Sequence, residues 1–177
     1  MILEHWGATP SEVARSMTGD DICPSARLIA TRAITLDAPP SDVFPWLRQM
    51  GFGRGGWYSY DFVDNLGRRS ARSINPKWQT LSNGDKVPGG PASFTAMVVD
   101  SPRALVLALG DGSTRARKVV FTLAYELHDD SRGTRLVSRV RARIDVPAGH
   151  IIERLFLGPG DGIMLRRQLL NLAQRIK

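Results

Sequence analysis

The densest group of chemically able side chains lies in one short stretch, Arg54–Asp61 (RGGWYSYD), which holds a guanidinium, an indole N–H, two phenol hydroxyls and a carboxylate. Rings with an apolar body and a polar tip suit the mouth of a pocket, where they pack a ligand and orient it. In an enzyme, Tyr58, Tyr60 or Asp61 would act as general acid or base, and Arg54 would hold an enolate or a carboxylate. Alternatively, Arg54 and Asp61 form a structural ion pair that fixes the loop.

The segment Gly51–Gly56 (GFGRGG) satisfies the pattern G-x-G-x-x-G of dinucleotide-binding loops. Such a site needs a strand before the loop, a helix N-terminus after it, and an acidic residue about 20 positions later at the end of a second strand. Here residues 44–50 have a helical pattern, and no acidic residue stands in the required place. We therefore predict no cofactor, and expect the glycines to turn a connection between two helices.

Other catalytic and metal-binding patterns are missing from the sequence. There is no G-x-S-x-G elbow, and the only cysteine, Cys23, has no histidine near it in sequence. His5, His128 and His150 are far apart, and His150 with Glu153 offers only two candidate ligands, which makes a poor metal site. We predict no metal and no internal disulfide, and expect Cys23 to fill space in the core.

The net charge of +7 is carried by 20 arginines and 4 lysines against 17 acidic residues. Because the arginines are spread from Arg15 to Arg175 and form no block, the charge disfavours a nucleic-acid-binding function. No run of about 18 apolar residues exists, so we predict no transmembrane segment. The N-terminus lacks the basic start and apolar run of a secretory signal, so we expect the protein in the cytoplasm.

Local patterns predict the elements that position these groups. A capping box from Thr9 to Glu12 begins a short helix that ends near Gly19. Residues 27–36 are rich in β-formers and predict the first strand. Short helices follow over 41–50 and 60–66. Further strands are expected over 78–87, with a hairpin turn at Asn83-Gly84, and over 93–100, 104–109, 118–127 and 134–146.

Residues 161–177 predict a long amphipathic helix with Asp161 as its N-cap. In the strand before it, Arg139, Arg141 and Arg143 alternate with apolar residues, so one face of the sheet is expected to be basic and solvated. The other face carries apolar side chains of modest size, which leaves room for a ligand pocket unless other elements fill that space.

Several sequence pieces resemble the SRPBCC superfamily, and within it a bacterial branch. They are WGAT from Trp6, TRAI from Thr31, Ala38–Pro40, WLRQMG from Trp46 and, above all, GRGGWYSYD from Gly53. Gln79, Gly84-Asp85 and TRLVSR from Thr134 fit the same branch, so the resemblance spans nearly the whole chain. The chain departs from it at Phe44, where a tryptophan is common, and at Met17-Thr18, where Leu-Pro is expected.

The resemblance implies an α+β helix-grip fold, in which a curved antiparallel sheet wraps around a long C-terminal helix, with short helices after the first strand. START lipid-transfer domains, birch-pollen-allergen-like proteins and polyketide cyclases share it. We expect one domain over 1–177, with residues 1–26 as a helical extension packed on it. Because the fold hosts carriers, sensors and cyclases, it does not by itself assign a function.

The favoured hypothesis is binding or carriage of a hydrophobic small molecule, such as a lipid, an aromatic or a polyketide-like compound, in an internal cavity. The alternatives are a polyketide cyclase- or dehydratase-like enzyme, and an interaction module that uses the basic sheet face. Whether the chain catalyses a reaction stays open. The exposed arginine row favours a monomer. The side chains expected to contact the ligand are Trp46, Trp57, Tyr58, Tyr60, Phe121, Leu123, Tyr125 and Met164.

Overall fold

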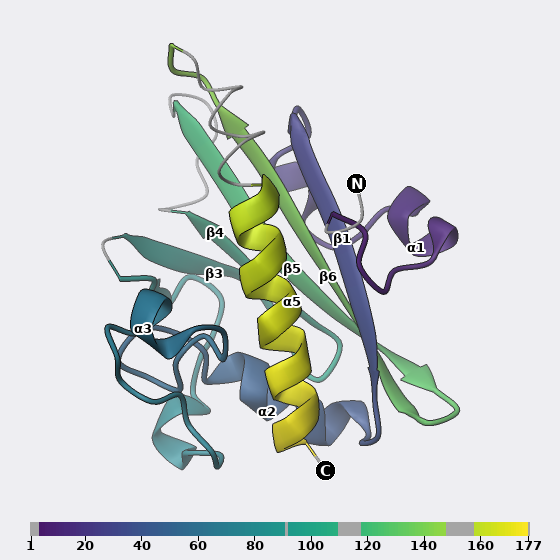
Figure 1. The fold of residues 1–177 in the computed structure, drawn as a ribbon, viewed down its shortest axis with the longest axis vertical. Coiled ribbons are helices and arrows are strands. Elements are labelled where there is room, and N and C mark those ends of the chain that lie inside the picture. The colour runs from purple at the N-terminus through teal and green to yellow at the C-terminus, as the bar shows by residue number, and fades with distance from the viewer. Residues whose placement is uncertain (1–3, 91, 110–117, 148–157, 177) are drawn as a thin grey trace.

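The computed structural model describes residues 4–90, 92–109, 118–147 and 158–176 (Figure 1). Within these ranges the chain forms one six-stranded antiparallel sheet in the order β1-β6-β5-β4-β3-β2. Its strands are β1 (Leu28–Leu36), β2 (Lys86–Pro88), β3 (Ser93–Asp100), β4 (Ala104–Leu109), β5 (Val119–Asp130) and β6 (Gly133–Ile144). Helix α5 (Gly158–Arg175) lies across one face of this curved sheet, so the predicted helix-grip fold is confirmed.

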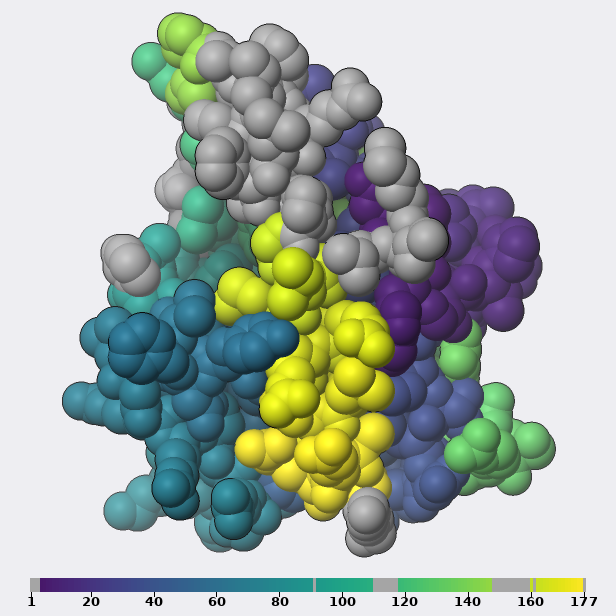
Figure 2. Space-filling model, in the orientation of Figure 1, coloured from purple at the N-terminus to yellow at the C-terminus, as the bar shows by residue number. Residues whose placement is uncertain are grey.

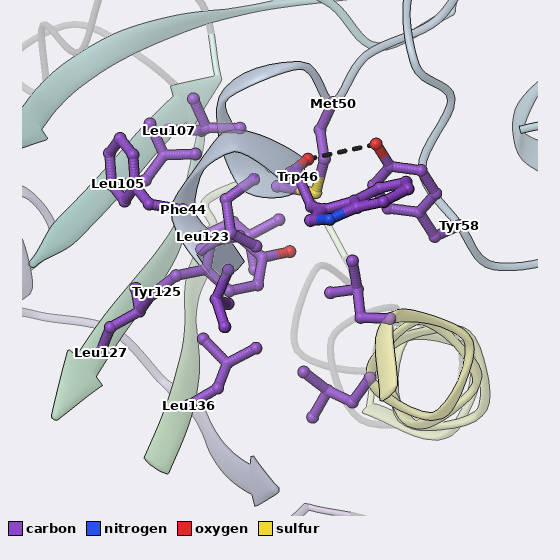
Figure 3. Close-up of a cluster of buried hydrophobic side chains, with 14 of the residues drawn as sticks. Phe44, Trp46, Met50, Tyr58, Leu105, Leu107, Leu123, Tyr125, Leu127 and Leu136 are labelled. Atoms are coloured by element: carbon purple, nitrogen blue, oxygen red, sulfur yellow. Dashed lines mark hydrogen bonds between the residues drawn. The ribbon is translucent and has the colours of Figure 1, made fainter. Parts of the chain in front are cut away.

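The main core lies between α5 and the inner face of the sheet. Alternate residues of a strand share one face, and this places Leu105 and Leu107 of β4 opposite Leu123 and Tyr125 of β5. On α5 the buried apolar residues Leu165, Leu169 and Leu172 recur at helical spacing and belong to the same core, as does Ile176 directly after the helix. Figure 3 shows the sheet and α2 side of this core. The apolar stripe that the sequence predicts is therefore the surface that grips the sheet.

Helix α2 (Pro40–Arg48) follows β1 and buries Val43, Phe44 and Leu47 against the same core. The glycine-rich loop comes directly after this helix, as predicted, and not after a strand. Gly51 and Gly56 pair as an isolated antiparallel bridge, and both have positive φ angles. A Cβ on Gly56 would lie 2.4 Å from Ser70 Oγ, so glycine is needed there for close packing of the loop.

The N-terminal segment, residues 4–26, covers the outer face of the sheet. It contains α1 (Pro10–Ala14), which has the predicted Thr9–Glu12 capping box, and the short 3-10 helix η1 (Asp20–Ile22). Trp6 accepts a hydrogen bond at its carbonyl from the amide of Ala33 on β1, and Gly19 packs on Val106 of β4. The segment therefore reaches from the edge strand to the middle of the sheet.

This covering segment corrects the prediction of a solvated basic face. The Arg139 residue is only 2% exposed, and its guanidinium donates to the carbonyls of Glu12, Val13 and Arg15 and to the Asp20 carboxylate. Arg135, Arg141 and Arg143 also bind partners in the segment: Glu12, Cys23 and Ser25. Backbone carbonyls in an irregular segment have no partners from a helix or sheet and need other hydrogen-bond donors. A guanidinium can serve several of them at once, because it has five N–H groups in a fixed planar arrangement. The arginine row is thus an internal anchor, which removes the free surface that the interaction-module hypothesis required.

Four local predictions need correction. Helix α1 ends at Ala14 and not near Gly19. The Asn83-Gly84 turn does not join two paired strands, because residues 76–78 form the 3-10 helix η2 (Pro76–Trp78) and β2 pairs with β3 instead. Helix α5 begins at Gly158, so Asp161 lies inside it and is not its N-cap. Helix α3 is limited to Asp61–Asp64. In each case the local pattern is present, but tertiary packing selects the partner or the boundary.

Candidate functional site

A pocket of about 180 Å³ lies among the sheet, α5 and the segment that leads into α3. Its apolar lining consists of the side chains of Trp57, Phe94, Phe121, Leu123, Met164 and Leu165. The ring of Phe94 packs edge-to-face with Trp57 at a centroid distance of 5.5 Å, and tilted against Phe121 at 6.1 Å. These contacts give the pocket a continuous aromatic wall.

The wall is held in place by two polar residues within the buried face of α5. The Gln168 Nε2 donates to the carbonyl of Trp57 at 2.7 Å, and its Oε1 accepts from the Tyr125 hydroxyl at 2.6 Å. The Asn171 Nδ2 donates to the carbonyl of Tyr58 at 2.7 Å. Figure 2 shows the outside of this arrangement, where α5 lies between the α3 region and the N-terminal residues. Helix α5 thus both grips the sheet and fixes residues 57–59 at the pocket.

Tyr58 is locked into the core beside the pocket and does not line it. Its residue is 0% exposed, and its hydroxyl donates to the Trp46 carbonyl at 3.2 Å (Figure 3) and accepts from Gln49 Nε2 at 2.8 Å. Burial raises the pKa of this phenol to about 12. Its backbone has a φ of 58°, a conformation that is strained for a bulky residue. A fully bonded phenol with this pKa is a structural group and a poor proton donor.

Two polar side chains in the pocket are left without hydrogen-bond partners. Both carboxylate oxygens of Asp64 and the hydroxyl of Ser59, whose residue is 8% exposed, are buried and have no partner of good geometry among the described residues. Burial, and after it the charge of Asp61, raise the pKa of Asp64 from 3.8 to about 6. The backbone N–H groups of Ser59 and of Asp64 itself oppose this rise. Buried polar atoms without partners are uncommon in folded proteins and mark places where a ligand can bind.

The rest of the Arg54–Asp61 cluster faces other hollows. Tyr60 and Asp61 line an open polar hollow of about 700 Å³ together with Arg167, and Asp61 accepts a hydrogen bond from Ser70. Arg54 lies in a third hollow of about 270 Å³ and donates to the carbonyls of Arg48 and Trp78. The alternative of an Arg54–Asp61 ion pair is therefore wrong. Residues adjacent in sequence are distributed over separate sites.

The predicted ligand-contacting residues divide into three groups. Trp57, Phe121, Leu123 and Met164 line the apolar pocket; Trp46, Tyr58 and Tyr125 belong to the packed core; and Tyr60 lines the polar hollow. Sequence reasoning missed Asp64, Phe94 and Gln168. The spacing of three between Asp61 and Asp64 gave no usable signal, because the two carboxylates line different hollows.

The described residues contain neither a cluster of metal ligands nor a membrane-spanning helix. No three His, Cys, Asp or Glu side chains within them gather in a group that could hold a metal ion. Cys23 is buried, and His128 contacts Glu126 with a distance of 3.1 Å between Nε2 and Oε2. His150 and Glu153, which the sequence analysis rejected as a metal site, lie outside the described residues. None of the described helices combines the length and apolar character needed to cross a membrane.

No family model matches the chain, and no curated protein matches it in sequence. Solved structures do resemble it. A protein from Arthrobacter aurescens has a TM-score of 0.53 at 12% identity, covering 93% of this chain and 91% of that one. Proteins from Nitrosomonas europaea and Mesorhizobium loti have TM-scores of 0.53 and 0.52 at 14% and 13% identity. Each alignment covers 84% of this chain. It covers 93% of the Nitrosomonas europaea protein and 96% of the Mesorhizobium loti protein. At such identities the likeness shows the fold alone.

Proposed function

We propose that this protein binds a hydrophobic small molecule, with an aromatic or alicyclic body, in the pocket between the sheet and α5. The observation that carries the proposal is the lining, in which an aromatic wall surrounds two unsatisfied polar groups, Ser59 and Asp64. Ligand sites are typically concave and mostly apolar, with a few polar groups that fix the ligand's orientation. The ring contacts and the hydrogen bonds from Gln168 and Asn171 indicate that the wall is formed before binding.

A neutral fluorescent probe, N-phenyl-1-naphthylamine, tests uptake into the pocket. We expect saturable binding with increased fluorescence, because the apolar wall excludes water from the probe. The variant Met164→Trp enlarges a side chain that lines the pocket and should weaken binding about tenfold or more.

The matched control is Ile163→Trp, on the neighbouring position of α5, because Ile163 is half exposed and does not line the pocket. Its affinity should stay close to that of the unmodified protein. Absence of saturable binding, or equal weakening by both substitutions, would contradict the proposal. Native mass spectrometry of the purified protein, followed by denaturation, would identify any molecule that co-purifies.

A second candidate function, a cyclase- or dehydratase-like enzyme, is favoured by one observation. The pKa of Asp64 is raised to about 6 in an apolar pocket, which suits a general base for abstracting a proton next to a carbonyl. In this candidate function the general base is Asp64, and not Tyr58, Tyr60 or Asp61 as the sequence analysis suggested. In deuterium oxide, 2-tetralone should exchange its α-hydrogens faster with the protein than with Asp64→Asn. Equal rates would remove the enzymatic candidate.

A further inference from the structure

The apolar pocket has an unbalanced charge. Among the described residues that line it, Asp64 is the only ionisable side chain, and no lysine or arginine lines the pocket. A partly buried carboxylate without a counter-charge costs free energy, because the protein does not replace the water removed from it. The surplus of basic residues in the whole chain therefore does not extend to this site.

The groups packed around Asp64 do not supply the missing charge. Asp61, one turn earlier on α3, carries a like charge, and the backbone N–H groups of Ser59 and Asp64 that act on the carboxylate carry no net charge. On α5, the pocket-lining residues Met164, Leu165 and Gln168 are uncharged. Arg167 lies over the ring of Tyr60 in the polar hollow.

We propose that the ligand carries a protonated amine on its aromatic or alicyclic body, and that Asp64 and Ser59 bind this ammonium group. An ammonium has three N–H donors and no acceptor, which matches the two carboxylate oxygens and the hydroxyl oxygen left unpaired in the pocket. The body of the ligand packs against Trp57, Phe94 and Phe121. The inference rests on the proposed function and narrows it to a chemical class.

The same geometry predicts an order of affinity among ligands that share one ring system and differ only in their polar group. An alcohol supplies one donor and no charge, so it should bind more weakly than the amine. A carboxylate brings a like charge to Asp64 and should bind most weakly. This order runs against the overall charge of +7, which by itself would favour the anion.

Isothermal titration calorimetry with three matched probes tests the order: 2-naphthylmethylamine, 2-naphthylmethanol and 2-naphthoate. At pH 7.5 we expect the amine to bind about tenfold or more tightly than the alcohol, as a charge-assisted hydrogen bond provides. The variant Asp64→Asn should abolish most of this preference while retaining alcohol binding. Lowering the pH below about 6 should reduce the preference in the same way, because Asp64 becomes protonated.

The matched control is Asp61→Asn, which removes a carboxylate three residues away that lines the polar hollow and binds Ser70. It should preserve the preference for the amine. An equal loss of the amine preference in both variants would show that overall negative charge near the pocket causes the preference. That result would overturn the proposed direct contact between the ammonium and Asp64. Equal binding of all three probes would overturn this inference and leave the proposed function standing. Failure of every probe, N-phenyl-1-naphthylamine included, would overturn both.

Discussion

At the scale of single residues, two carboxylates show how position sets the protonation of an acidic side chain. Asp64 lies in the apolar pocket, and burial raises its pKa to about 6. Glu12 lies in the N-terminal segment, where hydrogen bonds from Arg135 lower its pKa to about 2. The two groups should therefore affect stability with opposite dependence on pH.

For Asp64, the folded state binds its proton more tightly than the unfolded state, so its charge is destabilising. This cost is absent below pH 4, grows as the pH rises to about 6, and stays constant above that value. Discounted for solvent screening, Asp64→Asn should stabilise the protein by about 1 kcal/mol at pH 7.5 and have little effect at pH 4. Urea denaturation at both values measures the difference. A destabilised variant at pH 7.5 would show that Asp64 has a favourable partner in the fold.

For Glu12, the folded-state pKa is depressed, so its contribution is stabilising above about pH 4.5 and is lost as the pH falls toward 2. Glu12→Gln should lower the free energy of unfolding by about 1 kcal/mol at neutral pH, allowing for partial solvent screening. The control is Asp129→Asn, which breaks an exposed ion pair with Arg103 and should cost less than about 0.5 kcal/mol. Equal effects from the two substitutions, measured by urea denaturation, would refute a special role for Glu12.

Among the helices and strands, α5 combines an apolar stripe with two buried polar residues, Gln168 and Asn171. A pattern that records only apolar and polar positions does not assign these two residues to the buried face. Gln168 joins the Trp57 carbonyl to the Tyr125 hydroxyl, and so it connects the pocket wall to the sheet. The amphipathic pattern correctly predicted the helix and its buried stripe. It could not predict these bonds, because their partners lie more than 40 residues away in the chain.

Replacing Gln168 with leucine keeps the size of the side chain but leaves the Trp57 carbonyl and Tyr125 hydroxyl without this partner. We expect a loss of about 2–3 kcal/mol in the free energy of unfolding, because two buried hydrogen bonds are lost. The variant should also bind N-phenyl-1-naphthylamine more weakly, since the wall is no longer fixed. On the exposed side of the same helix, Gln174→Leu should change neither quantity appreciably. A stable Gln168→Leu variant would show that packing alone holds the wall.

At the scale of the whole molecule, the sheet is covered on both faces by segments from opposite ends of the chain. Helix α5 covers the inner face (Figure 1). The N-terminal segment covers the outer face through the buried Arg139 and the cluster of Met17, Ala33 and Val137. A sheet with two covered faces has apolar or fully bonded residues on both sides. This explains why the arginine row is buried.

The substitution Arg139→Met tests how firmly the outer cover is held. It leaves the carbonyls of Glu12, Val13 and Arg15 without their donor, and should cost about 2–4 kcal/mol. Trypsin should then cleave within residues 4–26 faster than in the unmodified protein. The control Arg132→Met breaks an exposed pair with Asp37 and should leave the cleavage rate unchanged. Equal cleavage rates for both variants would mean that other contacts hold the segment.

Local sequence patterns predicted the order of the main helices and strands, the capping box and the long C-terminal helix. These features follow from local geometry, since side-chain periodicity and capping depend on residues only a few positions apart. Tertiary contacts determine that both faces of the sheet are covered, which ring hydroxyls are already bonded, and that Asp64 and not Asp61 lies in the apolar pocket. Those outcomes depend on contacts between residues far apart in the chain. Burial and charge balance, which set the chemistry of the site, are properties of the assembled neighbours and have no local signature.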